Sequence, residues 1–203
     1  MTIGKGAPYG RPGALPDGAV VVASDAEARA VVTDARRAGG AVPALGLLGG
    51  DLCRTLGGLG DEQRLRRGHG TVVPVDLGTV LLDGRLEFFV AHLAAHRWDW
   101  GGPVVVAMNA EWLGEWDLGP RAHPNDGLLD VTEGSLGFRD RLAARRKARS
   151  ASHLPHPRLR ATRVSAGTYS FDKGVTIRLD GETAGRARQI VLRVEPDALT
   201  VVV

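Results

Sequence analysis

Apolar residues gather in short runs, separated by glycine-rich turns, over the first third of the chain. The run at 19–23 (AVVVA) predicts a buried strand, and the polar pair at 24–25 can cap a helix through residues 26–40. Residues 42–50 predict a second strand that enters a glycine turn, and residues 51–58 predict a short helix. This order of strand, helix, strand and helix predicts a small parallel α/β unit.

After Gly70 the pattern changes to that of an all-β region. Two β-rich runs flank residues 82–84, where Asp-Gly is a strong hairpin signal, and residues 103–114 predict a further strand. A basic helix is expected over Phe138–Ala151, and residues 160–203 predict a series of short strands. Turns are expected in that last segment at Asp172-Lys173-Gly174, Asp180-Gly181 and Pro196-Asp197. The predicted fold class is therefore α/β plus all-β.

The first eighteen residues are rich in glycine and proline, which break both helix and strand patterns. We therefore expect residues 1–18 to form an extended arm or loop. The change of pattern near Gly70 divides the remaining chain into a reduced α/β domain at 19–70 and a β domain at 71–203.

Composition narrows the class of protein without giving a function. The 203 residues suit one large domain or two small ones, and a formal net charge of +3 is too slight to imply a polyanionic partner. Cys53 is the single cysteine, which excludes an internal disulfide and a cysteine zinc site and favours a reducing cytoplasm. The first residues contain no apolar signal core, and the apolar runs are too short to span a bilayer.

Five segments of the chain together form a recognisable pattern. They are LGLLGGDLCRTLGG (Leu45–Gly58), MNAEWLGEWDLGPRAHPNDGLLDV (Met108–Val131), HLPHPRLRATRV (His153–Val164), IRLDGETAG (Ile177–Gly185) and VEPDALTVVV (Val194–Val203). In this order they resemble segments of the diacylglycerol kinase-like lipid kinases, a family related to NAD kinases and sphingosine kinases. The first segment is similar to that family's G-T-G-N-D-F-A-R-T-L-G turn and helix. The second is similar to its D-D-G-L-L-D-V stretch, and the fourth to its D-G-E turn.

The resemblance implies a truncated, nucleotide-binding-like α/β unit followed by a β-sandwich domain. It also implies ATP and Mg²⁺ as cofactors and a lipid or other small-molecule hydroxyl as the acceptor. Glu182, the glutamate of D-G-E, would then be the general base that takes the proton of that hydroxyl. A solvated hairpin turn at residues 180–183 is the structural alternative.

Four residues of the first segment would contact the nucleotide: Gly49, Gly50, Asp51 and Arg54. The two glycines lack Cβ, so the backbone could approach phosphates closely. Asp51 matches the acid of the family's N-D pair. Helix capping by Asp51 is an equally good explanation of its position.

Asp126 and Asp130 lie in the stretch that supports a structural Mg²⁺ in the resembling enzymes, and hard cations prefer carboxylate oxygen. Asn125 stands where the family has its first aspartate, which removes one negative charge. An Asx-turn that leads into a strand is the alternative interpretation.

The predicted helix carries a basic run, whose members include Arg145, Arg146, Lys147 and Arg149. Such a run can lie on an anionic membrane surface or on nucleic acid phosphates, and a solvated helix face is the common alternative. A membrane surface ranks above nucleic acid, because no recognised nucleic-acid motif accompanies the run. The expected location is cytoplasmic, with a peripheral position at the inner membrane face if the run contacts lipid.

The four tryptophans, Trp98, Trp100, Trp112 and Trp116, are expected to pack in the core or between strands. A lipid-contacting aromatic patch is the alternative, although exposed apolar patches are uncommon in monomers.

The family's diagnostic G-G-D-G-T motif is absent. The joint between the first predicted strand and helix reads Ala23-Ser24-Asp25-Ala26-Glu27, where Asp25 alone matches, and a Cβ at the former glycines would crowd a phosphate. Two hypotheses follow. The first is a reduced ATP- and Mg²⁺-dependent kinase, and the second is a catalytically inactive homologue that binds a lipid, a metabolite or a protein. A homodimer is implied by the resemblance alone.

Overall fold

Strands make up most of the computed structural model, which describes residues 9–137, 140, 144, 146–149 and 156–203. The three longest are β4 (Gly70–Leu82), β12 (Ala166–Leu179) and β13 (Glu182–Val202). The others are β1 (Arg11–Gly13), β2 (Val20–Val22), β3 (Leu45–Leu47), β5 (Arg85–Phe89), β6 (His92–His96), β7 (Gly102–Met108), β8 (Trp112–Leu113), β9 (Trp116–Asp117), β10 (Leu129–Leu136) and β11 (Leu159–Val164). The helices are α1 (Asp25–Arg37), α2 (Gly50–Thr55) and α3 (Glu62–Arg66), and Asp140, Ala144 and residues 146–148 are also helical.

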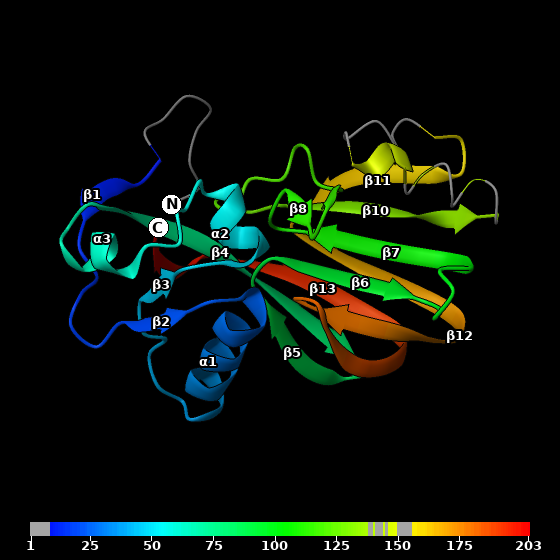
Figure 1. The fold of residues 1–203 in the computed structure, drawn as a ribbon. Coiled ribbons are helices and arrows are strands. Elements are labelled where there is room, and N and C mark those ends of the chain that lie inside the picture. Colours follow the sequence, from blue (N-terminus) through cyan, green and yellow to red (C-terminus); the bar gives the residue numbers. More distant parts are fainter. Residues whose placement is uncertain (1–8, 138–139, 141–143, 145, 150–155) are drawn as a thin grey trace.

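Within the described part of the chain, hydrogen bonds join eleven strands into one sheet with the main order β1-β4-β13-β12-β6-β7-β10-β11. This sheet folds over on itself, so that β4 and β13 lie across from β7 and β10 (Figure 1). Val80 and Ile190 from the first pair of strands share a buried apolar cluster with Val105 and Val131 from the second pair. The sheet therefore forms a two-layer β-sandwich, as the family resemblance implies.

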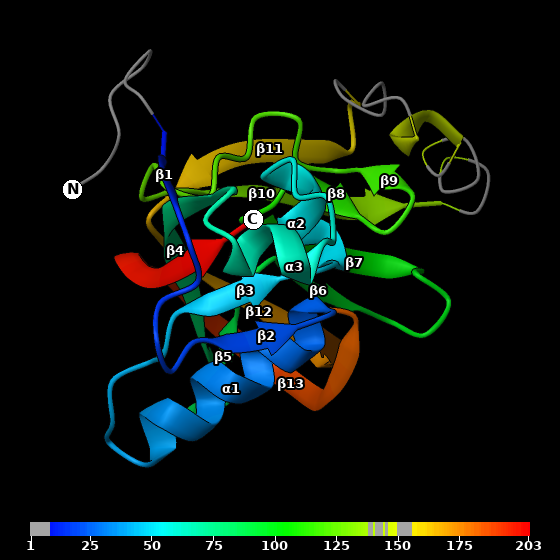
Figure 2. The ribbon, with the colours of Figure 1, turned by 60° about the vertical axis from the view of Figure 1, so that its left-hand side comes forward.

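The predicted parallel α/β unit is also present. Strands β2 and β3 pair in parallel, with Val20 opposite Leu45, and α1 connects them (Figure 2). The side chain of Ser24 caps α1 by accepting a hydrogen bond from the Glu27 backbone N–H at 3.2 Å. The capping pattern in the sequence therefore gave the start of this helix correctly.

Two predicted Asp-Gly hairpins are confirmed. One joins β4 to β5 at Asp83-Gly84, and the other joins β12 to β13 at Asp180-Gly181. Both aspartates adopt a left-handed backbone, with φ of 47° and 50°, and each is followed by a glycine that also has positive φ. This is the geometry that a two-residue turn requires to match the twist of its strands.

Two other expected turns are wrong. Asp172, Lys173 and Gly174 lie inside β12, where the pairing with β13 shifts register between Ser170 and Val175. Pro196 and Asp197 lie inside β13, where the pairing with β4 shifts between Glu195 and Leu199. These residues form bulges within continuous strands. A bulge favours the same residue types as a turn, but the strand continues on both sides of it.

The expectation of an arm over residues 1–18 needs correction within the described residues. Arg11–Gly13 forms β1 and pairs with the start of β4, with Arg11 opposite Val72. The helix α3 was not expected from the sequence; it has five residues, and Asp61 caps it by accepting a hydrogen bond from Arg64 N–H. The local sequence does not predict this edge strand, because proline and glycine disfavour strands. The strand forms because it pairs with β4.

The predicted domain boundary at residue 70 falls at the start of β4. Hydrogen bonds cross it, because β13 pairs with β3 through Val201 and Leu45 and with β4 along most of its length. The division into separate domains remains a prediction. No helix in the described ranges is long and apolar enough to cross a bilayer.

Candidate functional site

A group of acidic and basic side chains meets where α1, α2, β6 and the β12–β13 hairpin converge. Asp25 begins α1, Asp51 lies in the first turn of α2, and His92 begins β6. Asp180 comes from the turn between β12 and β13. We call these four residues the acid–histidine cluster.

The Asp25 carboxylate binds the start of α2. Its Oδ2 accepts a hydrogen bond from the Asp51 backbone N–H at 2.5 Å, and its Oδ1 accepts one from the Leu52 N–H at 3.1 Å. Gly50 has a φ of 94°, and a Cβ there would lie 2.5 Å from the Asp25 Oδ1 atom. The glycine is therefore needed for this contact. In this arrangement the two amides do not fit a phosphate cradle, because Asp25 already accepts from both.

Asp51 in turn contacts β6 and the β8–β9 turn. Its Oδ2 lies 3.0 Å from His92 Nε2 and accepts a hydrogen bond from the Gly114 N–H at 2.9 Å. Burial acts to raise the pKa of Asp51, but these hydrogen bonds outweigh it and hold the pKa below its ordinary value. Burial opposes a charged His92 ring, yet Asp51 and the nearby Asp180 carboxylate raise the pKa of His92.

Asp180 fixes the backbone that leads into β6. Its carboxylate is buried and accepts hydrogen bonds from the N–H groups of Val90, Ala91 and His92 at 2.9, 2.8 and 3.1 Å. Burial raises the pKa of Asp180, while His92 and the three amides act in the opposite direction. Through these bonds the β12–β13 turn determines where His92 lies.

The side chain of Arg29, on α1, connects Glu182 to the acid–histidine cluster. The Arg29 guanidinium donates a hydrogen bond to Glu182 Oε2 at 2.5 Å, and its Nε lies 3.9 Å from Asp180 Oδ2. The Glu182 side chain is 62% exposed, so solvent or an acceptor can reach it. The chain thus brings Glu182 and Asp51 into one connected network.

The acid–histidine cluster includes a set of donors that fits a divalent cation. One ligand atom each from Asp25, Asp51 and His92 lies within 4.8 Å of the others. Two carboxylates and one imidazole are a donor set that divalent metals accept. The contact between His92 and Asp51 holds two of these donors together.

Asp126 and Asp130 bind arginine in this structure. Asp126 forms an ion pair with Arg163, and the Arg163 Nε atom lies 3.0 Å from Asp130 Oδ1. Arg121 approaches Asp130 at 3.9 Å. A guanidinium thus occupies the space between the two carboxylates, and their role as magnesium ligands stays a prediction.

Gly49 and Arg54, which were expected to contact a nucleotide, flank the cluster. A Cβ on Gly49 would lie 2.5 Å from the Ala23 carbonyl oxygen, so glycine is required where β2 and α2 meet. The Arg54 guanidinium stacks on the Trp112 ring at 3.4 Å and donates a hydrogen bond to the Gly114 carbonyl. Its contact with a nucleotide stays a prediction.

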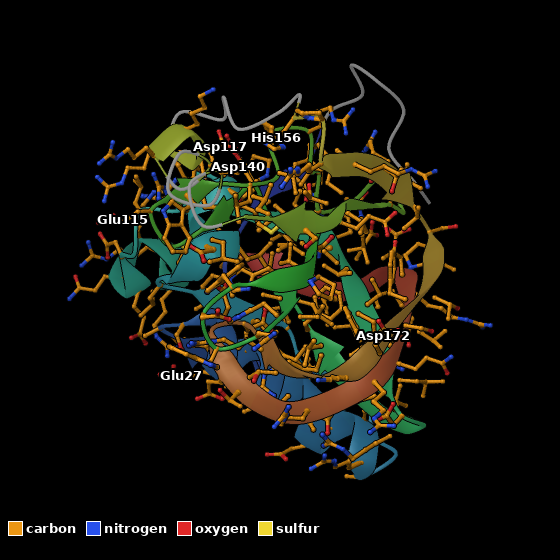
Figure 3. All side chains as sticks on the ribbon, turned by 90° about the vertical axis from the view of Figure 1, so that its right-hand side faces the viewer. Glu27, Glu115, Asp117, Asp140, His156 and Asp172 are labelled. Carbon is orange, nitrogen blue, oxygen red and sulfur yellow. The ribbon has the colours of Figure 1, made fainter. Side chains whose placement is uncertain are left out.

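The basic run lies partly outside the described residues, which exclude Arg145. Arg146, Lys147 and Arg149 are exposed. Arg149 forms an ion pair at 2.7 Å with Glu115, whose side chain is labelled in Figure 3. Contact of this run with a membrane stays a prediction.

The tryptophans differ in their exposure and in their ring contacts. Trp98 is 85% exposed, so the expectation that it packs in the core is wrong. It lies in the loop between β6 and β7. Trp100 stacks on His96 with ring centroids 3.8 Å apart, and Trp116 meets Trp100 edge to face at 6.5 Å.

Four residues of this site were not among those expected from the sequence: Asp25, Arg29, His92 and Asp180. His92 lies in the apolar run VAHLAAH, where a histidine inside a buried strand was the available signal. Arg29 follows the spacing of an ordinary exposed helix residue. Arg29 belongs to the site because its guanidinium donates a hydrogen bond to Glu182, which lies far away in the sequence.

Comparison with known proteins supports this architecture. Residues 80–203, more than half of the chain, match the family described as the YegS C-terminal NAD kinase beta sandwich-like domain. The chain therefore belongs to that family, and its resemblance to the diacylglycerol kinase-like lipid kinases is confirmed. No curated protein sequence matches it significantly.

Two similar solved structures come from Bacillus anthracis str. Sterne. One is a candidate diacylglycerol kinase with a TM-score of 0.69 and 14% identity, and the match covers 90% of this chain and 77% of that one. The other is described as a diacylglycerol kinase, with a TM-score of 0.56, 14% identity and coverage of 79% and 66%. At this identity the likeness shows the fold alone.

Burial, followed by the nearby Asp180 carboxylate, raises the pKa of the Asp25 carboxyl to about 6 from an ordinary value of 3.8. The folded chain therefore keeps this proton at pH values where the unfolded chain has released it. The stability that the neutral carboxyl contributes is present below the unfolded pKa. It is lost as pH rises through the folded pKa, between about pH 4 and pH 6.

The direction of the Asp25 pKa shift predicts how the stability of the protein depends on pH. Relative to the Asp25→Asn variant, metal-free wild-type protein is expected to lose about 2–3 kcal/mol of unfolding free energy as pH rises from about 4 to 6. Urea unfolding of both proteins in the presence of a chelator measures the difference. A difference that does not change with pH would mean that Asp25 does not titrate in this range.

Proposed function

We propose that the chain is a metal-dependent phosphotransferase that uses ATP and acts on a lipid or other small-molecule hydroxyl. The observation that carries this proposal is the network Glu182–Arg29–Asp180–His92–Asp51. It joins a solvent-accessible carboxylate to a set of metal donors in which Asp25 and His92 are buried and Asp51 is half-buried. Phosphoryl transfer needs both, because catalysis consists mostly of positioning and charge neutralisation.

Glu182 is proposed as the general base. A base must come within hydrogen-bond distance of the hydroxyl proton, and an exposed carboxylate on a hairpin turn can do so. Arg29 occupies one side of this carboxylate, and a carboxylate has further lone pairs to offer to a hydroxyl. Arg29 thus orients the base and leaves it able to accept a proton.

Asp25 and Asp51 are proposed to hold Mg²⁺, with His92 positioning Asp51. A bound Mg²⁺ neutralises charge on the transferring phosphate. Contact with the nucleotide is expected through the cation and through the exposed Arg54 guanidinium, since Asp25 occupies the amides of α2.

Thermal unfolding with nucleotide tests this assignment. At about one hundred times the dissociation constant, Mg²⁺-ATP should stabilise the protein by about 2.7 kcal/mol. Chelation of Mg²⁺ and the Asp51→Asn variant should each remove this stabilisation. Asp126→Asn is the matched control, because Asp126 is already paired with Arg163, and it should retain the stabilisation.

A second candidate function is that of a catalytically inactive homologue that binds a lipid, a metabolite or a protein. The Asp25 carboxylate favours it, because it occupies the two backbone amides that a phosphate would need. The absence of the G-G-D-G-T glycines points the same way. An unchanged unfolding temperature in millimolar Mg²⁺-ATP would support this second function over the first.

A further inference from the structure

A groove lies at one end of the sandwich, between strands of its two layers. On one side it is lined by Pro103–Val105 of β7, by Glu133–Ser135 of β10 and by the start of β11, and on the other side by Thr168–Phe171 of β12. It holds about 1050 Å³ of space free of protein atoms, part of which is open to solvent. This space reaches the upper end of the range for small-molecule sites, about 300–1,000 Å³.

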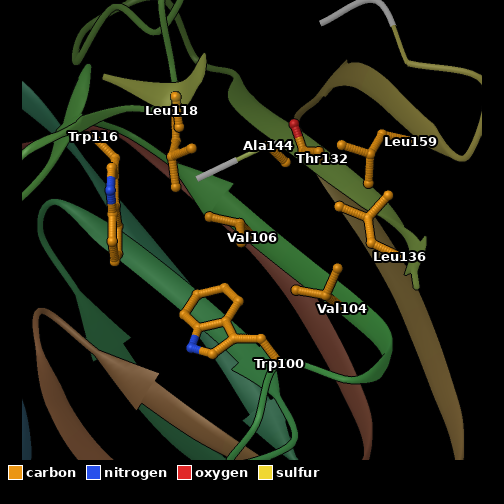
Figure 4. A pocket seen from close by; sticks show the side chains of 10 residues that line it. Trp100, Val104, Val106, Trp116, Leu118, Thr132, Leu136, Ala144 and Leu159 are labelled. Atoms are coloured by element: carbon orange, nitrogen blue, oxygen red, sulfur yellow. The ribbon is translucent and has the colours of Figure 1, made fainter. Parts of the chain in front are cut away.

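The groove is on the other face of the sheet from the apolar cavity that Figure 4 shows. That cavity lies over the outer face and is lined by Val106 of β7 and Thr132 of β10, among others. Val105 and Glu133 are their neighbours along the same strands, so their side chains point to the opposite face, between the two layers. The groove also lies at the start of β7, whereas the acid–histidine cluster lies beside the end of that strand.

One wall of the groove is an unpaired edge of the sheet. The strand β6 pairs with β12 from Leu179 back to Thr176 and then ends. Among the described residues, no strand continues this pairing along Ala166–Ser170, whose other side pairs with β13. The first half of β12 is therefore an edge strand, although its second half is central.

The register shows which backbone groups face this free edge. The Val194 N–H donates to the Ser165 carbonyl at 2.9 Å, and from there the pairing of β12 with β13 continues without a shift as far as Ser170. In an antiparallel pair, hydrogen-bonded and non-hydrogen-bonded positions alternate. The N–H and C=O groups of Thr168 and Ser170 therefore point away from β13, toward the free edge.

This edge lacks features that prevent a strand from pairing with another chain. Its sequence, AGTYSF at 166–171, contains no charged residue and no proline. A row of alternating donors and acceptors is complementary to the backbone of a second extended segment. The edge is thus suited to a peptide ligand.

The groove beside the edge offers contacts for the side chains of such a segment. Val105 and Phe171 are buried and give the groove an apolar floor. Arg158 and Arg160 also line it, with side chains that are 63% and 77% exposed and ion pairs that are long, at 3.5 and 3.8 Å. Exposed pairs of this kind contribute little, so both guanidinium groups can turn to an acidic ligand.

We propose that the first half of β12 binds an extended peptide segment of a partner protein, which adds one strand to the sheet and carries acidic residues toward Arg158 and Arg160. Main-chain hydrogen bonds to Thr168 and Ser170 supply affinity, and an apolar side chain of the segment lies on the buried floor of the groove. The inference does not depend on the proposed function, because this edge is separate from the acid–histidine cluster.

Titration calorimetry and amide hydrogen exchange with a pair of synthetic hexapeptides test the proposal. One peptide alternates valine with glutamate, the other alternates valine with lysine, and both have blocked ends. The glutamate peptide should bind saturably and at least about tenfold more tightly than the lysine peptide. It should also slow the exchange of the Thr168 and Ser170 amides, which face the free edge.

Thr168→Pro removes an N–H that the peptide would bind, and it should weaken binding of the glutamate peptide by at least about tenfold, or 1.4 kcal/mol. The Thr168 N–H takes no part in the pairing with β13, and proline is compatible with an edge strand at such a position. Thr168→Val is the matched control, because valine keeps the N–H and should bind as the wild type does. If Thr168→Pro does not fold, amide exchange in the wild-type protein decides the question.

The outcomes distinguish this proposal from the others. Failure of the glutamate peptide to bind, or binding that leaves exchange at Thr168 and Ser170 unchanged, would overturn the proposal. Equal binding of the two peptides would overturn the acidic character of the partner. Self-association that protects the same amides without peptide would assign the edge to a second copy of this chain instead. Absence of kinase activity with retained peptide binding would overturn the proposed function alone.

Discussion

Replacement of Asp180 with alanine is expected to lower the free energy of unfolding by about 3–5 kcal/mol. The Asp180 carboxylate is buried and is the acceptor for three consecutive backbone N–H groups, at Val90, Ala91 and His92. Alanine would leave these donors in the interior without this acceptor. Removal of one partner of a buried charged group is costly for this reason.

The β4–β5 hairpin supplies a matched control. Asp83 occupies the same place in its own Asp-Gly turn, with a φ of 47° against 50° for Asp180, and accepts from the Arg188 and Gln189 N–H groups. Asp83 is exposed, so water can replace its carboxylate, and Asp83→Ala should cost about 1 kcal/mol. Urea unfolding of both variants gives the comparison. Equal costs would show that the turn conformation, and not the buried carboxylate, dominates.

Asp180→Asn separates charge from backbone strain. Asparagine tolerates the left-handed backbone and retains one acceptor oxygen, so its cost should lie between that of alanine and zero. If the alanine variant is as stable as the wild type, Asp180 does not organise the start of β6.

Glu182→Gln is expected to lower phosphoryl transfer by about 10²–10⁴-fold and to leave stabilisation by Mg²⁺-ATP unchanged. Glutamine keeps the size of the side chain and its hydrogen bond to Arg29, but it cannot take a proton at neutral pH. Binding and turnover should therefore separate in this variant. The measurement is transfer of labelled phosphate from ATP to monolauroylglycerol, alongside the unfolding temperature with and without Mg²⁺-ATP.

Glu195→Gln is the control for this variant. Glu195 also lies on β13 and also pairs with an arginine of α1, since Arg36 contacts it at 2.6 Å. It lies outside the acid–histidine cluster, so turnover should stay at the wild-type level. Unchanged turnover in Glu182→Gln would remove Glu182 from the role of base.

The local elements of the fold could be predicted where capping and turn residues act over short distances. Ser24 marked the start of α1, and the Asp-Gly pairs marked two hairpins. The turns expected at 172–174 and 196–197 were wrong, because those residues bulge within strands that pairing with β4 and β13 holds straight on either side. Long-range pairing of this kind leaves no local signal.

Two acids of the candidate site could be predicted from the sequence, whereas the other acids and the connections between them could not. Asp51 and Glu182 stand out in motifs, whereas Arg29 becomes important through a contact across 153 residues of sequence. Asp126 and Asp130 matched a metal-binding pattern, but the approach of Arg163 depends on the pairing of β10 with β11. The sequence alone does not say which acids meet a cation and which meet an arginine.

The position of a bound cation tests the central assignment most directly. Crystals grown with Mn²⁺ and ATP would locate the metal by its anomalous scattering. The account predicts an anomalous peak within ligand distance of the Asp25 and Asp51 carboxylates, beside His92. A peak between Asp126 and Asp130, or none at either place, would contradict the assignment of the metal site to the acid–histidine cluster.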